Sequence, residues 1–239
     1  MPEAEFRVPI FFEYAATLAW AMSGAVVGVR ERFDLTGVFV IALLSSLGGG
    51  LVRDAIFLQR TPVFLLQPVY LILVAAATVL IVLFTGPLTR LLRADTVRKL
   101  VDVIDALGTP AFAVIGMQLA EDHKIPTAGV LFIGVVNGTA GGLLRDVVVR
   151  DVPSLLRPGQ FVSLALLLVC ALYLLLTRQS RVSPVDAAWI IVASFFVIRV
   201  LAVKFNWRTR SIGGGSLPID VGPDAYDADE NPDEPVEPR

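Results

Sequence analysis

The apolar positions of the chain fall into seven long runs separated by short polar segments. Each run approximates the roughly 17 to 25 residues that an α-helix needs to cross the hydrocarbon core of a membrane. A membrane β-barrel would instead show alternating segments of about ten residues. The pattern therefore predicts an all-α, polytopic membrane protein with seven transmembrane helices, at residues 12–29, 35–58, 68–86, 100–120, 127–149, 161–177 and 185–203.

Composition supports a membrane protein and argues against a cleaved signal peptide and a disulfide. Of the 239 residues, 55% are hydrophobic and 18% are charged, whereas about a quarter of the residues of a soluble domain are charged. The leader of the first run holds Glu3 and Glu5 against Arg7, which is not the basic start of a secretory signal, so we expect the first helix to be retained. The single cysteine, Cys170, excludes an intrachain disulfide.

The end of the chain differs in kind from the rest. Residues 217–239 hold eight acidic residues, one basic residue and five prolines, which is typical of a disordered segment. We therefore predict a disordered acidic tail over residues 211–239. Without residues 217–239 the chain carries 19 Lys and Arg against 14 Asp and Glu, so the membrane body is basic although the whole chain has a net charge of −2.

The distribution of Lys and Arg predicts the orientation, because cytoplasmic loops are enriched in these residues. With the N-terminus outside, eleven of them lie in the cytoplasmic segments and five lie in the outer ones. The sequence therefore predicts an outer N-terminus and a cytoplasmic C-terminus.

The chain also resembles itself after a shift of 92 residues, without a gap. Each copy contains three of the predicted helices, and an odd number turns the second copy upside down in the membrane. We therefore predict two inverted three-helix repeats, residues 10–86 and 100–177, followed by a seventh helix at residues 185–203. The matching positions are Glu13 and Asp105, Thr17 and Thr109, Gly24 and Gly116, Gly37 and Gly129, Gly49 and Gly141, Gly50 and Gly142, Leu51 and Leu143, Arg53 and Arg145, and Asp54 and Asp146.

Glycines are concentrated in the second helix of each repeat. Gly134, Gly138 and Gly142 recur at four-residue spacing, a pattern that serves close packing of helices in membranes. The consecutive glycines Gly48, Gly49 and Gly50 point in three directions around a helix, so one neighbour does not explain all of them. Such a run permits a kink or a short unwound segment, which a membrane tolerates where it lines a cavity.

An arginine and an aspartate follow the glycines in both copies, as Arg53 and Asp54 and as Arg145 and Asp146. A charge at the bilayer centre costs roughly 2.5 to 3.5 kcal/mol on insertion scales, so such residues usually pair, snorkel or face water. Snorkelling from near a helix end would explain one copy. Two copies at matching places favour a water-filled pathway.

The motifs "GGGLVRD" and "AGGLLRD", each in the second helix of a three-helix repeat, resemble the bacterial trimeric intracellular cation channel family, also grouped as glycine-transporter-like membrane proteins. The resemblance spans about residues 10 to 205. It implies a homotrimer in the bacterial inner membrane, with a pore for monovalent cations, chiefly potassium, in each subunit, and it places glycine-kinked helices at that pore. The second copy departs from the motif at Ala140, where the first has Gly48.

Two acids near the starts of matching helices are further candidates. Glu13 and Asp105 are equivalent in the repeat, and they either concentrate cations at the mouths of a pore or complement the helix dipoles. Asn137 and Thr139 offer polar atoms either to an ion or to a neighbouring helix. Arg199 in the last helix either snorkels or pairs with an acid such as Asp186.

Three classes of function remain open. The first is a passive channel for monovalent cations, the second a secondary transporter of glycine or another small amino acid, and the third a membrane scaffold without transport. A single histidine, His123, argues against a metal site, and the chain lacks a phosphate loop or a nucleophile triad. We therefore expect no enzyme activity, no metal, no cofactor and no nucleic acid, and we expect membrane lipids and monovalent cations as partners.

Overall fold

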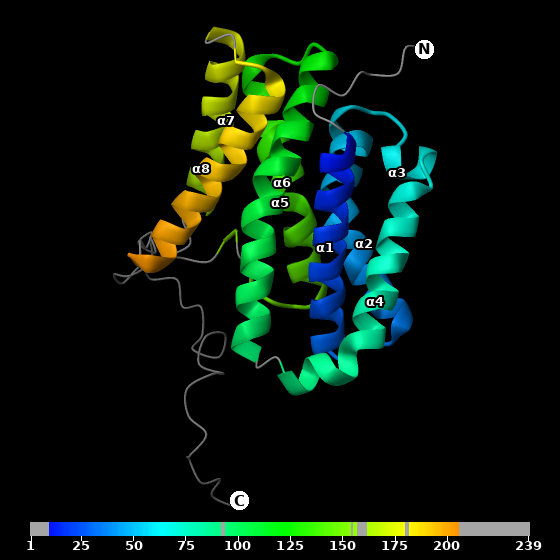
Figure 1. Ribbon diagram of the computed structural model, residues 1–239. Helices are drawn as coiled ribbons and strands as arrows, with labels where there is room; N and C mark the ends of the chain where they lie inside the picture. Colours follow the sequence, from blue (N-terminus) through cyan, green and yellow to red (C-terminus); the bar gives the residue numbers. More distant parts are fainter. Residues whose placement is uncertain (1–9, 92–93, 154, 157–161, 180–181, 206–239) are drawn as a thin grey trace, which may run out of the picture. The chain divides into compact units, whose positions relative to one another are not determined.

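The computed structural model describes residues 10–91, 94–153, 155–156, 162–179 and 182–205. The predicted acidic tail, residues 211–239, lies outside the described residues. Within the described ranges the chain forms eight α-helices, one π-helical turn and no strand, which confirms the all-α fold class (Figure 1). The elements are α1 (Ile10–Arg30), α2 (Leu35–Val52), the π-helical turn η1 (Arg53–Phe57), α3 (Val63–Leu66), α4 (Val69–Leu91), α5 (Ala94–Asp122), α6 (Thr127–Val148), α7 (Val162–Gln179) and α8 (Pro184–Lys204).

Each of the seven apolar runs coincides with a long helix, and the four-residue helix α3 was not predicted. Among the described residues, four helical stretches are long and apolar enough to cross a membrane, and two shorter helices are also apolar. The chain is thus an all-helical, multi-pass membrane protein, while the count of seven crossings stays a prediction. The four stretches are Leu35–Phe57, Val101–Asp122, Thr127–Val148 and Pro184–Ala202, and the two shorter ones are Val69–Phe84 and Ser163–Gln179.

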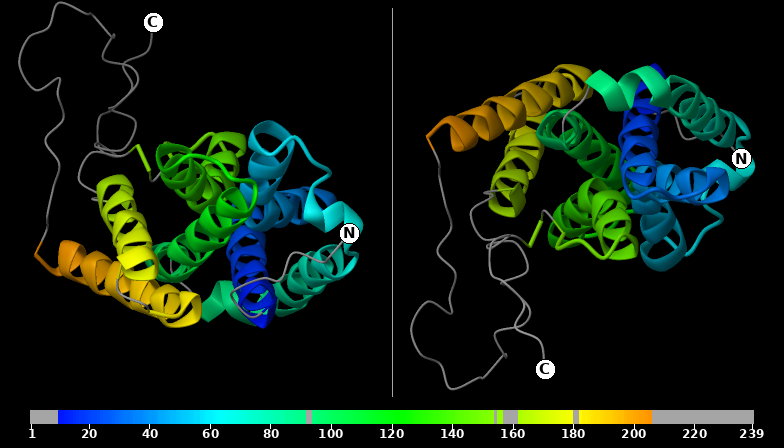
Figure 2. Two further views of the ribbon diagram at one scale, coloured as in Figure 1. Left: turned by 90° about the horizontal axis from the view of Figure 1, so that it is seen from above. Right: turned by 90° about the horizontal axis from the view of Figure 1, so that it is seen from below.

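Four helices form the centre of the described bundle. Helices α1 and α2 pack along each other, as do α5 and α6, and α2 also packs against α6. Figure 2 shows this centre from above and below, with α4 beside α1 and α2 on one side and with α7 and α8 beside α5 and α6 on the other. Two apolar clusters result, one among α1, α2 and α4 and one among α5, α6, α7 and α8.

Two short turns at matching positions connect the central helices. The turn between α1 and α2 contains Arg32 with a φ of 59°, and the turn between α5 and α6 contains Lys124 with a φ of 57°. These two residues stand 92 positions apart in the chain. In Figure 1 the α1–α2 turn lies at the lower end of the bundle and the α5–α6 turn lies at the upper end.

Glycines allow α2 and α6 to approach until their backbones touch. A β-carbon added at Gly49 of α2 would clash with the backbone carbonyl oxygen of Asn137 in α6. In reverse, a β-carbon at Gly141 of α6 would clash with the carbonyl oxygen of Ser45 in α2. Any side chain at either position would push the helices apart, so these two glycines fix the distance between the central helices.

Of the two alternatives for the three consecutive glycines, the unwound segment is not seen and the kink stays a prediction. Helix α2 runs without interruption through Gly48, Gly49 and Gly50 to Val52. The irregular backbone follows as η1, where the amide of Leu58 donates to the carbonyl oxygen of Arg53 at 2.9 Å, five residues back. The glycines stay helical because they serve helix contact, and the chain inserts its extra residue one turn later.

Candidate functional site

The two Arg–Asp pairs predicted from the sequence are buried ion pairs. Arg53 Nε and Nη2 donate to the two carboxylate oxygens of Asp54 at 2.8 and 2.9 Å. Arg145 Nε donates to Asp146 Oδ1 at 2.8 Å. None of these four residues is more than 7% exposed. Both guanidinium groups are therefore neutralised by the next residue inside the bundle rather than at its rim.

In the first pair, the aspartate makes most of the further hydrogen bonds. Asp54 also accepts a hydrogen bond from Arg60 Nε at 3.0 Å and one from the backbone amide of Val63 at 3.1 Å. Arg53 Nη1 reaches across to Asn137 Oδ1 on α6 at 3.4 Å. A β-carbon added at Gly50, one turn before Arg53, would lie 3.6 Å from Nη2 of the guanidinium, which is an ordinary contact distance. Asp54 is thus held by two arginines.

In the second pair, the arginine makes the further hydrogen bonds. Arg145 donates to both carboxylate oxygens of Asp105 on α5, at 3.1 and 3.5 Å, in addition to its bond with Asp146. Its Nη1 also donates to Ser23 Oγ on α1 at 3.3 Å. A β-carbon added at Gly142 would likewise lie 3.7 Å from Nη2 of this guanidinium. Arg145 is thus held by two acids.

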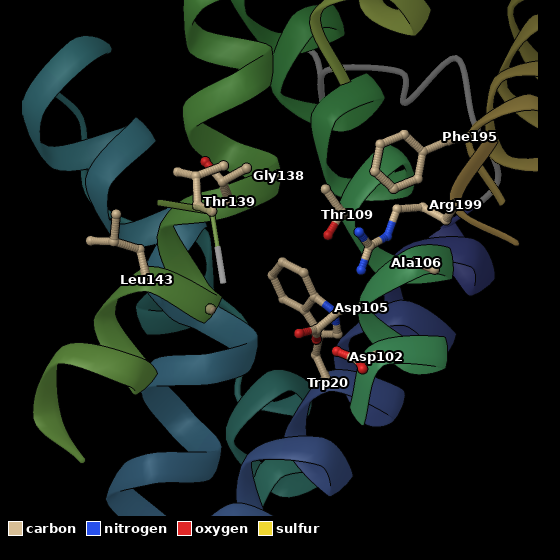
Figure 3. A pocket seen from close by; sticks show the side chains of 12 residues that line it. Trp20, Asp102, Asp105, Ala106, Thr109, Gly138, Thr139, Leu143, Phe195 and Arg199 are labelled. Atoms are coloured by element: carbon tan, nitrogen blue, oxygen red, sulfur yellow. The ribbon is translucent and has the colours of Figure 1, made fainter. Parts of the chain in front are cut away.

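Each half of the bundle contains a small polar cavity beside its Arg–Asp pair, and the linings match at a distance of 92 residues. The first cavity includes residues of α1, α2, η1 and α4, and the second, shown in Figure 3, includes residues of α5, α6 and α8. The space open to the centres of water molecules is about 20 Å³ in the first and about 30 Å³ in the second. Matching lining residues are Glu13 and Asp105, Thr17 and Thr109, Ser46 and Gly138, Leu47 and Thr139, Gly50 and Gly142, and Val63 and Leu155.

Two aromatic residues each belong to one half of the bundle and line the cavity of the other half. Trp20 of α1 lines the second cavity, and Phe112 of α5, its equivalent 92 residues later, lines the first. The rings stack with their centroids 4.8 Å apart and their planes at 29°. Both side chains are buried. The stacked rings therefore separate one cavity from the other.

The two predicted acids line the two cavities but differ in their partners. Asp105 binds Arg145 as described, whereas Glu13 is 6% exposed and its Oε2 atom has no hydrogen-bond partner. The pairing considered for Arg199 with Asp186 is wrong. Arg199 interacts electrostatically with Asp102 and Asp105 across the second cavity (Figure 3), while Asp186 accepts a hydrogen bond from Ser183 Oγ at 2.7 Å.

The other predicted site residues serve helix packing in the structure. Gly48 faces Leu144 and Gly141 of α6, and Gly138 faces the carbonyl oxygen of Thr109 on α5. Asn137 Nδ2 donates to the carbonyl oxygen of Phe112 on the neighbouring helix at 2.5 Å. Thr139 lines the second cavity, and its hydroxyl donates to Val135 in its own helix at 2.8 Å. Among the described residues, no group of His, Cys, Asp and Glu is arranged to hold a metal ion.

Sequence reasoning missed several cavity residues. Arg60 and Tyr70 of the first cavity region lie beyond the matching motif, and no pattern in the chain connects them to Asp54 or Glu13. The stacking of Trp20 and Phe112 could have been predicted from the sequence, because the shift of 92 residues aligns these two aromatic positions. An aromatic pair at equivalent positions of a two-fold repeat can meet on the axis itself.

A family model described as "Glycine transporter" matches the chain twice, at residues 10–86 and 102–178. The second match begins and ends 92 residues after the first. Relatives include a UPF0126 membrane protein of Deinococcus radiodurans, 34% identical over 61% of this chain and 65% of that protein, and one of Vibrio cholerae, 33% identical over 59% and 57%. The UPF0126 inner membrane protein YadS of Escherichia coli is 29% identical over 62% and 69%. The match to the first two thus spans less than two thirds of their length.

Solved channel structures share the fold. A TRIC cation channel superposes with a TM-score of 0.74 at 25% identity, covering 87% of this chain and 98% of that one. A prokaryotic TRIC channel in 0.5 M KCl gives a TM-score of 0.72 at 25% identity, over 83% and 97%. The TRIC trimeric intracellular cation channel orthologue from Rhodobacter sphaeroides has a TM-score of 0.73 at 23% identity, over 82% and 97%, which shows the fold. These relatives and structures are described as membrane proteins and channels, not as enzymes.

Proposed function

Because the chain belongs to the glycine transporter family, together with the UPF0126 membrane proteins and the TRIC channels, we propose that it is a cation channel. It passes monovalent cations, chiefly potassium, through a pore within each subunit of a homotrimer. The pore includes both polar cavities and runs past both Arg–Asp pairs. The membrane is the inner membrane of a bacterium, with the N-terminus outside and the C-terminus in the cytoplasm.

The observation that carries this proposal is the pair of matching polar cavities in the interior of an apolar helix bundle. Ionisable side chains inside a membrane usually pair with one another or face a water-filled path. Here the buried Arg53 and Asp54 line the first cavity, and the buried Arg145 binds Asp105, which lines the second. Side chains that snorkel would extend their charged ends toward a rim, and these four do not. An interior route for ions explains why the chain retains charges in both halves.

An inverted repeat gives the pore its symmetry in this proposal. The family model matches the two segments at a constant shift. The reciprocal glycine contacts, Gly49 with Asn137 and Gly141 with Ser45, join positions that exchange under that shift. A pseudo-two-fold axis in the membrane plane produces such exchanges. The axis passes near the stacked rings of Trp20 and Phe112, because equivalent residues can touch only close to it.

The stacked rings are where we expect the pathway to be closed. On one side lies a cavity with space for a water molecule, and on the other a cavity with space for about two. Between them the rings of Trp20 and Phe112 leave only an apolar contact. An apolar constriction excludes hydrated ions, so conduction requires the rings to part. The described conformation is then a closed state of the channel.

Potassium flux measured beside glycine uptake tests the proposal. Purified protein in liposomes should carry potassium after the ion gradient is applied, and flux should not saturate at low concentrations as a carrier's does. Labelled glycine should not accumulate, because the proposed pore passes cations rather than zwitterions. Saturable uptake of glycine without potassium current would establish the transporter instead. Absence of both fluxes from protein that is correctly assembled would leave a scaffold.

A further inference from the structure

Three buried oxygen atoms without partners meet in the first cavity. Glu13 Oε2, Thr17 Oγ1 and the Tyr70 hydroxyl make no hydrogen bond, and their residues are 6%, 0% and 2% exposed. All three residues line the same cavity. The Tyr70 hydroxyl lies close to the Glu13 carboxylate and interacts with it electrostatically. Buried polar atoms are nearly always satisfied in folded proteins, so three orphans around one space indicate a missing occupant.

The matching acid of the other half shows what kind of occupant is missing. Asp105 has the guanidinium of Arg145 at 3.1 Å from its carboxylate. Glu13 has no cation in such direct contact. Arg53 donates to Asp54 and Asn137, and Arg60 Nε donates to Asp54, so both arginines act on Glu13 only from a distance. Glu13 therefore lacks the positive group that its equivalent possesses. The occupant that completes the first cavity carries positive charge.

The size and the donors of the cavity restrict the cation further. About 20 Å³ is open to water centres, which admits one particle of the size of a water molecule. The available donors are oxygens, namely the carboxylate and two hydroxyls, and Ser46 Oγ adds a fourth while it donates to Ala42 at 2.8 Å. Calcium and magnesium are commonly held by several carboxylates or keep some of their waters. A single free carboxylate in a space this small suits a monovalent cation without its hydration shell.

We propose that Glu13, Thr17 and Tyr70 form a binding site for one dehydrated monovalent cation of potassium size in the first cavity. The cation takes the place at Glu13 that the Arg145 guanidinium takes at Asp105. Protein oxygens replace its hydration shell, as they do in ion filters. The inference rests on the proposed channel function, because the bound ion is the one that permeates. The second cavity lacks such a site, since Arg145 already occupies its acid.

Cation-dependent stability tests binding independently of transport. The full-length protein in detergent is unfolded by heat in KCl, in RbCl and in N-methylglucamine chloride at equal ionic strength. Potassium and rubidium should raise the melting temperature of the wild type, because a ligand that binds only the folded state stabilises it. Glu13→Gln should weaken the potassium midpoint by about tenfold or more, as expected when a charged ligand is lost. Glu31→Gln, a change of the same type at an exposed position, should keep the wild-type response.

Two further measurements keep the test decisive if Glu13→Gln does not fold. Thr17→Val and Tyr70→Phe each remove one oxygen at nearly constant volume, and each should weaken the potassium midpoint severalfold. Crystals soaked in thallium salt should show an anomalous peak within coordination distance of Glu13. A potassium response that survives all of these substitutions, or density that is the same with and without thallium and so represents ordered water only, would overturn the site.

The outcomes separate this site from the channel proposal. Potassium-dependent stabilisation that requires Glu13, without any flux in liposomes, would support the site and refute the channel. Potassium flux together with a stability that does not depend on potassium would support the channel and refute the site. Flux that persists in Glu13→Gln with an unchanged dependence on potassium concentration would also refute the site.

Discussion

The two Arg–Asp sites share a motif but reverse the roles of its residues. In the first, Asp54 is the centre and holds Arg53 and Arg60. In the second, Arg145 is the centre and holds Asp105 and Asp146. The first site therefore has an excess of arginine around its pair, with Glu13 left apart, and the second an excess of acid. A repeated motif fixes which groups are present, while the backbone around it decides which of them meet.

The backbone difference between the sites amounts to one residue. After Arg53 the chain makes a π-helical turn, in which Leu58 donates to Arg53, five residues back. After Arg145 the helix stays regular, and Val149 donates to Arg145, four residues back. The left-handed residues that end the two helices, Gln59 and Arg150, are accordingly 91 positions apart rather than 92. The extra residue reorients the first motif relative to its neighbours, as π-helical turns do at functional sites.

The largest expected effect concerns the inversion of the two halves, because its outcome is all or none. Glu31 and His123 occupy matching positions in the α1–α2 and α5–α6 turns. In a Cys170→Ala background, Glu31→Cys should react with a membrane-impermeant thiol reagent only from the cytoplasmic side, and His123→Cys only from the outside. Both side chains are exposed, so access to the reagent does not limit the reaction. Labelling of both from one side would disprove the inverted repeat.

The next effect is expected at the helix contact that the two halves share. Gly49→Ala and Gly141→Ala should each destabilise the protein by about 1 to 3 kcal/mol or more, because the new methyl groups meet carbonyl oxygens of the facing helix. Gly50→Ala and Gly142→Ala are matched controls, since a β-carbon there has its nearest neighbour at 3.6 and 3.7 Å. Unfolding in denaturing detergent measures the difference. Equal stability in all four variants would show that α2 and α6 do not pack in this way.

Replacing the arginine of each motif should change the stability of the protein by different amounts at the two sites. Arg145→Gln leaves Asp105 and Asp146 buried without their shared cation, and breaking such a pair costs about 3 to 5 kcal/mol. Arg53→Gln should cost less, because Arg60 still neutralises Asp54 at 3.0 Å. The same unfolding assay compares them, and potassium flux is measured on the variants that assemble. A larger loss in Arg53→Gln than in Arg145→Gln would contradict the reversed roles.

The stacked rings provide a test in flux rather than in stability. Trp20→Ala and Phe112→Ala each remove one half of the contact between the cavities, so each should raise the basal potassium flux of liposomes. Phe132→Ala is the control, because Phe132 is 58% exposed on α6 and its ring contacts Phe57 rather than a cavity. The two ring variants should behave alike if the axis lies between them. Unchanged flux in both would place the closed point elsewhere.

The sequence predicted the helices and the equivalent positions well, because long apolar runs and a constant shift are local signals. It predicted that Glu13 and Asp105 correspond, and both line cavities. It could not predict that only Asp105 binds an arginine, because that depends on a one-residue bulge without a signal in the chain. It could not predict the contacts of the glycines, since sequence alone does not show that the Asn137 carbonyl approaches Gly49 and that the Ser45 carbonyl approaches Gly141.

The smallest expected effect concerns a residue without an equivalent in the first half. Arg199 belongs to α8, which lies outside the repeat, and it interacts with Asp102 and Asp105 at the second cavity. Arg199→Gln removes positive charge beside these acids, so cations should enter more readily and conductance should rise by about twofold or less, as for a partly exposed charge. Lys204→Gln, an exposed change on the same helix, is the control. The difference should fade as salt is raised, because screening weakens the field of Arg199 along with that of its partners. A fall in the conductance of Arg199→Gln would contradict this role. An effect equal to that of Lys204→Gln at low salt would also show that Arg199 does not control the entry of cations into the second cavity.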